Sequence, residues 1–497
     1  MPQQAIEIDT AALPVLCVDL DGTLVKSDTL HDSALAVARH HPLALLNIPS
    51  WLLQGKAALK RHLAATVQLD VAHLPYNREL LQYLQQQHAT GRPIYLATAA
   101  DADTARRVAA HLGLFTGVLA SDGQLNLAGK NKARRLPLPL RRQLHLHRQR
   151  PARPPPPRKL PGAHGRQPHP RTPHRPPQSR RHPRPHLRRD RLPLKAWPKA
   201  IRLHQWAKNV LIFVPLLLAH AWAPGILVAA ALAFLSFGLC ASATYIVNDL
   251  LDLEADRQHP RKRRRPFASG DLSALSGVFV VVLLLAVSLV LALSVPRVIA
   301  ALSPQLVSLI KPHYFLEWLG IYLVTTLAYS LRFKRSVLVD VIVLSGLYTI
   351  RIIAGSAASG VPVSTWLGSF SIFFFLSLAL VKRFAELENL SERGGSTVGG
   401  RGYHVSDIEQ LRSFGSASGF ASVVVLTLYI STLEAAQLYH HTRRLWLLVP
   451  VLILWIMRLW LQASRGQLNE DPVVYAITDR RSLLLGVLVA LIVLSAL

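Results

Sequence analysis

The chain has 497 residues, a formal net charge of +28 and 51% hydrophobic residues, much of them in long apolar segments after residue 208. This length allows two or three domains, and the apolar segments exclude a purely soluble globular protein. The two cysteines, Cys17 and Cys240, are far apart, which excludes a disulfide framework and a cysteine-ligated metal site. The first 14 residues lack the basic and apolar regions of a cleaved signal peptide, so none is expected.

The N-terminal region predicts an α/β domain. Residues 15–19 (VLCVD) form a short apolar strand that runs into DLDGTLV, and residues 93–98 (PIYLAT) form a second strand. The roughly 70 residues between them have a mostly helical pattern that predicts a small cap. The sequence therefore predicts a first domain over residues 1–136.

Asp19, Asp21 and the following glycine and threonine resemble motif I of the haloacid dehalogenase (HAD) phosphatases. In that family the first aspartate takes a phosphoryl group, the second is the general acid/base, and both need Mg²⁺ nearby. The resemblance implies that Thr98 holds the phosphoryl group and that Lys132 balances its charge. The alternative is a degenerate Rossmann-like domain without activity.

Residues 137–192 have a different composition, with 15 Pro, 15 Arg, 7 His and one acid, Asp190. Such a segment cannot bury a core, so we expect it to be disordered or partly polyproline II. A basic RNA-binding linker is one interpretation. We prefer a locally shifted reading frame in GC-rich coding sequence, because the HAD pattern stops in mid-domain. We therefore expect no nucleic-acid partner, although the net charge alone would favour one.

Residues 193–497 predict an all-α membrane domain. Nine apolar spans are expected, with the fourth interrupted and its membrane part near 314–330. The loops richest in Lys and Arg alternate with poorer ones, which places the N-terminus and every candidate motif on the cytoplasmic side of the cytoplasmic membrane. The predicted spans are 209–223, 226–247, 272–294, 298–330, 336–354, 366–381, 413–434, 445–463 and 482–497.

An acidic motif, NDLLDLEAD, directly follows the second of these spans. Asp249, Asp252 and Asp256 stand at i, i+3 and i+7, so on one helix their carboxylates would share a face. Carboxylates at a membrane boundary need a cation, and Mg²⁺ typically joins a few of them to substrate phosphates. The HPRKRRRP sequence that follows offers Lys262 and Arg265 to phosphate oxygens. A solvated amphipathic face is the alternative.

The spacing NDxxDxxxD followed by HPxKxxRP resembles the UbiA superfamily of intramembrane prenyltransferases. The resemblance implies that the three acids hold Mg²⁺ on a diphosphate and that Asn248 binds the substrate. Family members that prenylate aromatic acids carry a second acid-rich motif. Here the corresponding loop, YSLRFKRSVLVD, has one acid, Asp340, among basic and hydroxyl side chains.

This difference resembles the decaprenyl-phosphate phosphoribosyltransferase branch, together with QWAKN, KRFAEL and DPVVYAITDRRSL. In that branch Mg²⁺-bound phosphoribosyl diphosphate reacts with a polyprenyl phosphate. The expected partners are thus a polyprenyl lipid, a diphosphate substrate and membrane lipids. An aromatic polyprenyltransferase and a non-enzymatic scaffold are the alternatives. The further expected phosphate-binding or substrate-binding residues are Lys208, Tyr329, Lys334, Asp340, Arg351, Lys382 and Arg383.

Overall fold

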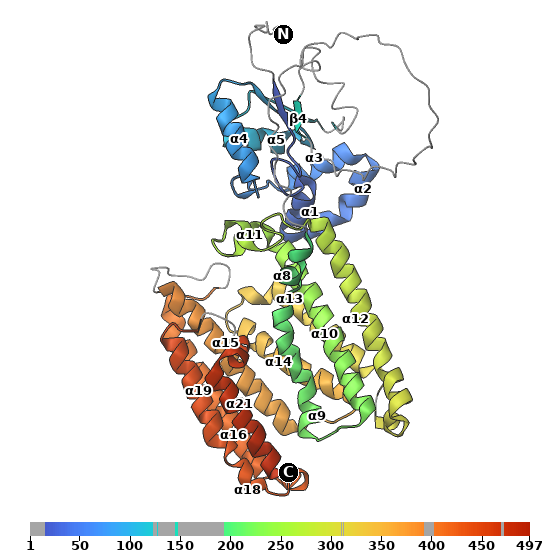
Figure 1. The fold of residues 1–497 in the computed structure, drawn as a ribbon, viewed down its shortest axis with the longest axis vertical. Helices are drawn as coiled ribbons and strands as arrows, with labels where there is room; N and C mark the ends of the chain where they lie inside the picture. Colours follow the sequence, from blue (N-terminus) through green and yellow to red (C-terminus); the bar gives the residue numbers. More distant parts are fainter. Residues whose placement is uncertain are drawn as a thin grey trace, which may run out of the picture. The chain divides into compact units, whose positions relative to one another are not determined.

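The computed structural model describes residues 15–122, 127, 145–147, 193–309, 311, 313–391, 402–468 and 472–497 (Figure 1). The chain divides into two compact units. The first comprises Met1–Trp197 with Asp249–Leu275, and the second comprises Pro198–Asn248 with Ser276–Leu497. Residues 136 and 192, where we predicted domain ends, and Lys132 lie outside the described residues.

The first unit contains a small sheet in which all strand pairs are parallel, in the order β3-β2-β1-β4. Strand β1 is buried along its whole length, which explains its uninterrupted apolar sequence. The two strands predicted near residues 15–19 and 93–98 are confirmed. The strands are β1 (Leu16–Val18), β2 (Ile94–Asp101), β3 (Gly117–Ser121) and β4 (His145–His147).

Helices connect these strands, and the helices between β1 and β2 agree with the helical pattern predicted there. The core between helices and sheet is built from residues such as Leu20, Leu84, Leu96 and Val108. Only the backbone of β4 is described in the segment 137–192, so the predicted nature of that segment is not tested. The helices are α1 (Thr29–His40), η1 (Pro42–Asn47), α2 (Ile48–Leu53), α3 (Lys56–Thr66), η2 (Val71–His73), α4 (Arg78–Ala89) and α5 (Ala102–Leu112).

The first unit also contains the acidic motif and the basic segment after it. This part includes α11 (Leu253–Gln258) and the 3₁₀ helix η5 (Lys262–Arg264). Helix α11 packs against η2 and against α1 of the N-terminal region, although more than 200 residues of the chain separate α11 from α1.

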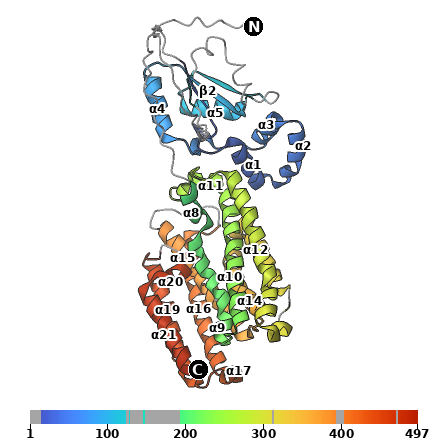
Figure 2. The ribbon, with the colours of Figure 1, turned by 45° about the vertical axis from the view of Figure 1, so that its right-hand side comes forward.

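The second unit is entirely helical in the part of it that is described (Figure 2). Helices α15 and α16 pack together, as do α13 and α14, and α19 lies beside α21 in both views. Helix α14 ends at Ser359 because Gly360 adopts a left-handed conformation (φ 74°). The helices after residue 192 are η3 (Pro193–Lys195), α8 (Trp197–Ile201), η4 (Leu203–Phe213), α9 (Val214–Leu218), α10 (Pro224–Leu251), α12 (Ala274–Leu302), η6 (Pro304–Leu309), α13 (Tyr314–Leu331), η7 (Phe333–Arg335), α14 (Val339–Ser359), α15 (Thr365–Ser391), η8 (Val405–Asp407), α16 (Ile408–Ile430), α17 (Leu433–Leu438), α18 (Thr442–Leu445), α19 (Leu448–Ser464), α20 (Pro472–Thr478) and α21 (Arg480–Ala496).

Among the described residues, six helices are long and apolar enough to cross a membrane: α10, α12, α14, α15, the η8–α16 segment and the α18–α19 segment. The predicted number of nine membrane spans is therefore not confirmed. The other three fall on η4–α9, on α13 and on α21, which are helical but fall short of that length or apolarity.

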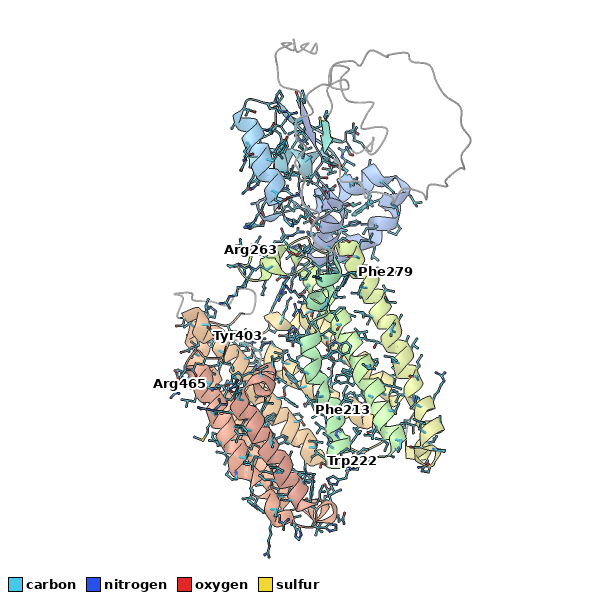
Figure 3. All side chains as sticks on the ribbon, viewed as in Figure 1. Phe213, Trp222, Arg263, Phe279, Tyr403 and Arg465 are labelled. Atoms are coloured by element: carbon cyan, nitrogen blue, oxygen red, sulfur yellow. The ribbon has the colours of Figure 1, made fainter. Side chains whose placement is uncertain are left out.

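Helix α12 has the clearest membrane-facing surface. Phe279 (Figure 3), Val282 and Val290 are each more than 60% exposed along it. Large apolar side chains in such number are costly in water and are expected where a helix contacts lipid. The second unit is thus a multi-pass membrane structure.

Candidate functional site

Two acids of the motif share one guanidinium. Asp249 lies in the last turn of α10 and Asp256 in α11, and their exposed fractions are 2% and 3%. Arg265 Nη1 donates to Asp249 Oδ1 at 3.0 Å and to Asp256 Oδ2 at 2.7 Å. Two buried carboxylates therefore meet at a single cationic position.

Asp252 has a different partner. Helix α10 ends at Leu251, and Asp252 is the N-cap of α11 with φ −92° and ψ 10°. Its carboxylate pairs with Arg39 of α1, which also donates to the Leu251 carbonyl at 2.8 Å. The expectation that one continuous helix places the three carboxylates on one face is therefore wrong, because the backbone leaves the helix between the first and third acids.

The donor set of Asp249 and Asp256 fits a hard cation such as Mg²⁺. Within the described ranges, no group of three or more His, Cys, Asp and Glu side chains is placed to hold one metal ion. Burial raises the pKa of Asp256 above its ordinary value, and the neighbouring Arg265 and Lys262 only partly offset this. The ionised pair is therefore short of positive charge, which a divalent cation supplies.

The other predicted members of this region lie around the pair. Asn248 precedes Asp249 in α10 and is half-buried, and Lys262 is exposed in η5. The amide of Asn248 and the ammonium group of Lys262 can both donate hydrogen bonds to phosphate oxygens.

A second ion pair, which no sequence pattern predicted, joins this motif to the N-terminal region. Arg257 Nη1 pairs with Asp32 Oδ2 at 2.9 Å, and both side chains are at most 6% exposed. Arg257 Nη2 also donates to Ser27 Oγ at 3.2 Å, and this hydroxyl donates to Asp32 at 2.6 Å. Removing one partner of a buried ion pair leaves the other charge buried and uncompensated, which is costly. The Arg257–Asp32 pair therefore fixes α11 to α1.

The N-terminal acids follow the strand as predicted. Asp21 Oδ1 accepts from the Thr29 amide at 2.8 Å, and Leu20 N donates to Asp19 at 3.0 Å. Val18 of β1 pairs with Leu96 of β2, so the fully buried Thr98 lies level with the end of β1. The structure thus brings the motif I acids and Thr98 to the same edge of the sheet.

Burial raises the pKa of Asp21 to about 6, although the Thr29 amide hydrogen bond lowers it. Lys60 of α3, which the sequence analysis missed, acts on Asp21 electrostatically and donates to the Ala99 carbonyl at 2.6 Å. A carboxyl with this pKa can give and take a proton near neutral pH.

In the second unit, Asp340 at the start of α14 is fully buried and has both oxygens occupied. Arg383 Nε of α15 donates to Oδ2 at 2.6 Å, and the Tyr403 hydroxyl (Figure 3) donates to Oδ1 at 2.5 Å. Arg383 also donates to the Tyr329 hydroxyl at 3.1 Å and pairs with Glu386. The structure therefore joins three predicted residues, Tyr329, Asp340 and Arg383, in one network with Tyr403 and Glu386.

Two other predicted residues, Lys334 in η7 and Lys382 in α15, are half-buried near the same loops. Burial and the hydrogen bond to Asp340 raise the pKa of Tyr403, so this hydroxyl stays protonated and remains a donor. Arg383 offsets the charge of Asp340, and their ion pair holds α14 to α15.

Lys208 and Arg351 form a third group with aromatic partners. Lys208 Nζ lies 5.5 Å from the centroid of the Tyr348 ring, and the Arg351 guanidinium lies 5.7 Å from the same centroid. Arg351 donates to Asn209 Oδ1 at 2.9 Å and to the Tyr322 hydroxyl at 3.2 Å. Both cations are less than a tenth exposed.

Known proteins resemble both parts of the chain. The uncharacterized protein y4nM of Sinorhizobium fredii is 36% identical over 487 residues, which cover 96% of this chain and 90% of that protein. A decaprenyl-phosphate phosphoribosyltransferase of Mycobacterium tuberculosis is 37% identical over 205 residues, which cover 40% of this chain and 62% of the enzyme. The N-terminal and membrane parts thus occur together in one relative, and the second relative matches less than half of this chain.

Among solved structures, a UbiA homologue from Archaeoglobus fulgidus bound to DMAPP and Mg²⁺ is 18% identical. Its TM-score is 0.42, over 60% of this chain and 96% of that chain. The model of the UbiA prenyltransferase family matches residues 210–478, more than half of the chain. With its apolar helices and its acidic motif at the end of α10, the chain belongs to the UbiA prenyltransferase family and is a membrane transferase.

Proposed function

We propose that the protein transfers a phosphoribosyl group from phosphoribosyl diphosphate to a polyprenyl phosphate in a Mg²⁺-dependent reaction. The name of the Mycobacterium tuberculosis relative supports this acceptor and this transferred group. The observation that carries the proposal is the contrast between the two acidic regions. Asp249 and Asp256 share one cationic position, whereas Asp340 has both oxygens hydrogen-bonded.

This contrast disfavours the aromatic prenyltransferase alternative. Such an enzyme would use a second acid-rich motif to hold a second metal on the prenyl diphosphate. Asp340 already forms a fully buried ion pair with Arg383 inside the helix bundle, and withdrawing it would leave Arg383 with the half-buried Glu386 as its acidic partner among the described residues. A single metal site suits a donor whose diphosphate is the leaving group.

In the proposed reaction a phosphate oxygen of the lipid bonds to C1 of the ribose, and the bond from C1 to the diphosphate breaks. Asp249 and Asp256 would hold Mg²⁺, which would offset the negative charge that develops on the leaving diphosphate. Arg265 and Lys262 would bind diphosphate oxygens, and the Asn248 amide would donate to them.

We also propose an HAD-like phosphatase activity for the N-terminal unit. Asp19 would attack a phosphomonoester and take the phosphoryl group, and Asp21 would protonate the leaving oxygen. Thr98 would orient the phosphoryl oxygens by hydrogen bonding. The parallel sheet, the common edge of these residues and the pKa of about 6 for Asp21 support these roles. With a cytoplasmic N-terminus, both activities would lie on one side of the cytoplasmic membrane.

The donor can be tested with purified protein in nanodiscs. Labelled phosphoribosyl diphosphate, Mg²⁺ and a polyprenyl phosphate should give a labelled lipid, and EDTA should abolish it. A parallel sample with a prenyl diphosphate and 4-hydroxybenzoate tests the alternative. A prenylated aromatic product without any labelled ribosyl lipid would overturn the proposal.

A further inference from the structure

The N-terminal region contains a short apolar segment that does not belong to its core. Helices η1 and α2 follow each other directly, with the sequences PLALLN and IPSWLL. All residues of these two helices are described, and none of them is buried. Leu43, Leu46 and Leu53 are 79%, 77% and 90% exposed. We call Pro42–Leu53 the apolar segment.

The length of the apolar segment limits what it can be. An apolar stretch of about 10–14 residues is too short to cross a bilayer and is typically a core helix, part of a signal peptide or an interfacial segment. The absence of buried residues excludes a core helix. Its place after α1, inside a folded unit, excludes a signal peptide. The membrane interface is the environment that remains of these three.

The charges around the apolar segment favour an anionic surface. Between Asp32 and Asp70 the sequence has no Asp or Glu but four Lys and Arg residues. Two of these, Lys56 and Arg61, are exposed on α3, which packs against α2. Bases next to exposed apolar side chains are typical of segments that bind anionic lipid head groups.

The aromatic and apolar side chains of the segment also suit a membrane interface. Trp51 is half-buried and stacks on His62 of α3, with 5.1 Å between the ring centroids. Tryptophan is enriched where membrane and water meet. In the 3₁₀ helix η1, side chains three residues apart lie on one face, so Leu43 and Leu46 project together. The segment thus offers leucines to acyl chains and an indole ring to the head-group region.

The apolar segment is connected to membrane helices through its own unit. It begins shortly after His40, whose Nε2 lies 3.6 Å from Glu254 Oε2 of α11. The preceding residue, Arg39, pairs with Asp252. Helix α11 lies in the chain between α10 and α12, which are both long and apolar enough to cross a membrane. This connection favours a lipid surface over a separate protein as the partner of the exposed leucines.

We propose that the apolar segment inserts into the head-group region of an anionic bilayer surface and anchors the N-terminal unit there. The leucines lie among the upper parts of the acyl chains, and Lys56 and Arg61 bind lipid phosphates. Helix α1 joins this segment to Thr29, whose amide donates to Asp21, so the anchor holds the motif I acids close to the membrane. The inference goes beyond the proposed function and depends on neither of the two activities.

Insertion can be measured on the full-length protein in nanodiscs of phosphatidylcholine and phosphatidylglycerol. Asn47→Cys keeps every apolar side chain of the segment and carries an environment-sensitive fluorophore. A lipid with a nitroxide below its head group should quench this label at least about threefold more than the same label on Gln85→Cys, an exposed position of α4. Iodide in the water should quench the two labels in the opposite order. Both native cysteines are buried, and wild type treated with the same reagent gives the background.

Adding Leu43→Asp and Leu53→Asp to Asn47→Cys should lower the nitroxide quenching to the level of Gln85→Cys, because charged side chains oppose insertion. The matched control adds Gln82→Asp and Gln86→Asp on α4, both at exposed positions, and should change nothing. In place of these changes, Lys56→Gln with Arg61→Gln should weaken quenching in discs with phosphatidylglycerol and leave it unchanged in discs of phosphatidylcholine alone.

Equal nitroxide quenching of the labels at positions 47 and 85 would overturn the inference, and this comparison needs no change to the leucines. A label at position 47 that is shielded from iodide but not quenched by the nitroxide would overturn it too, because protein would then cover the segment. Quenching that survives the two aspartates would show that the leucines do not drive insertion. No enzymatic activity enters these measurements, so the inference and the proposed function can fail separately.

Discussion

The acids of the motif do not all have the same cationic partner. Asp249 and Asp256 share Arg265, which the proposed function assigns to the diphosphate. Asp252 pairs with Arg39, which belongs to α1. Acids that the sequence treats as equivalent therefore differ in their readiness to bind a metal.

We predict that Asp249→Asn lowers ribosyl transfer at least about a hundredfold, because the loss of one metal-binding carboxylate removes charge stabilisation of the leaving group. Asp252→Asn should lower the rate of ribosyl transfer less, by about tenfold or under. Turnover is measured in nanodiscs, with Asp271→Asn at an exposed position as control. Equal losses for Asp249 and Asp252 would mean that Asp252 leaves Arg39 when substrate binds.

A second residue-scale prediction concerns Asp21, whose pKa is raised to about 6 from 3.8. Below about pH 4 the carboxyl is protonated in both the folded and the unfolded chain, and its stabilising contribution is complete. As the pH rises through 6, the folded state must ionise a buried group, and about 3 kcal/mol of that stability is lost.

Asp21→Asn should therefore stabilise the first unit at pH 8 in EDTA and have no effect near pH 4. Hydrogen exchange of peptides from β1 and β2, corrected for intrinsic rates, measures this locally. A difference between variant and wild type that does not change with pH would contradict the assigned pKa.

At the scale of elements, the contact between α14 and η4 positions the side chains of Lys208 and Arg351. A Cβ on Gly355 of α14 would lie 2.0 Å from the Ile212 carbonyl oxygen of η4. The two backbones can approach this closely only because that position is glycine. Lys208 and Arg351 face one ring because their helices are in contact here.

We predict that Gly355→Ala destabilises the protein by about 2 kcal/mol or more, because η4 must move away. Gly346→Ala in the same helix is the control, since nothing lies within 4 Å of its added Cβ. Thermal unfolding is measured for both variants. A Gly355→Ala protein with wild-type melting would show that the contact is not close in solution.

At the scale of the whole molecule, one chain combines a transferase with a proposed phosphatase. Ribosyl transfer would leave a 5-phosphate on the lipid-linked sugar, which is a phosphomonoester. A covalent link to the phosphatase raises its local concentration at the product toward about millimolar. Such a product need not diffuse to a separate enzyme.

We predict that wild type releases a dephosphorylated lipid-linked ribose and that Asp19→Asn accumulates the phosphorylated lipid at an unchanged rate of transfer. Mass analysis of the lipid product separates the two species. Glu79→Gln, an exposed acid in α4, should behave as wild type. The same phosphorylated product from wild type and Asp19→Asn would contradict the coupling.

Much of the fold was predictable because its signals are local. The apolar run at residues 15–18 predicted β1, and the break at residues 311–313 predicted where α13 begins. The acidic motif identified Asp249 and Asp256 from residue type and spacing alone. The number of membrane spans was less predictable, since short segments such as η4–α9 and α21 are apolar but lie at the limit of the length needed.

The sequence by itself determined the class of each part: a parallel α/β region, a multi-pass helical region and an acidic motif of the UbiA family. Periodicity and residue type suffice for this because they act over a few turns of chain. The tertiary structure decided the partners. Arg39 joins Asp252 across 213 residues, and Arg351 joins Asn209 across 142. Charges so far apart leave no local pattern, because their pairing depends on which helix faces pack together.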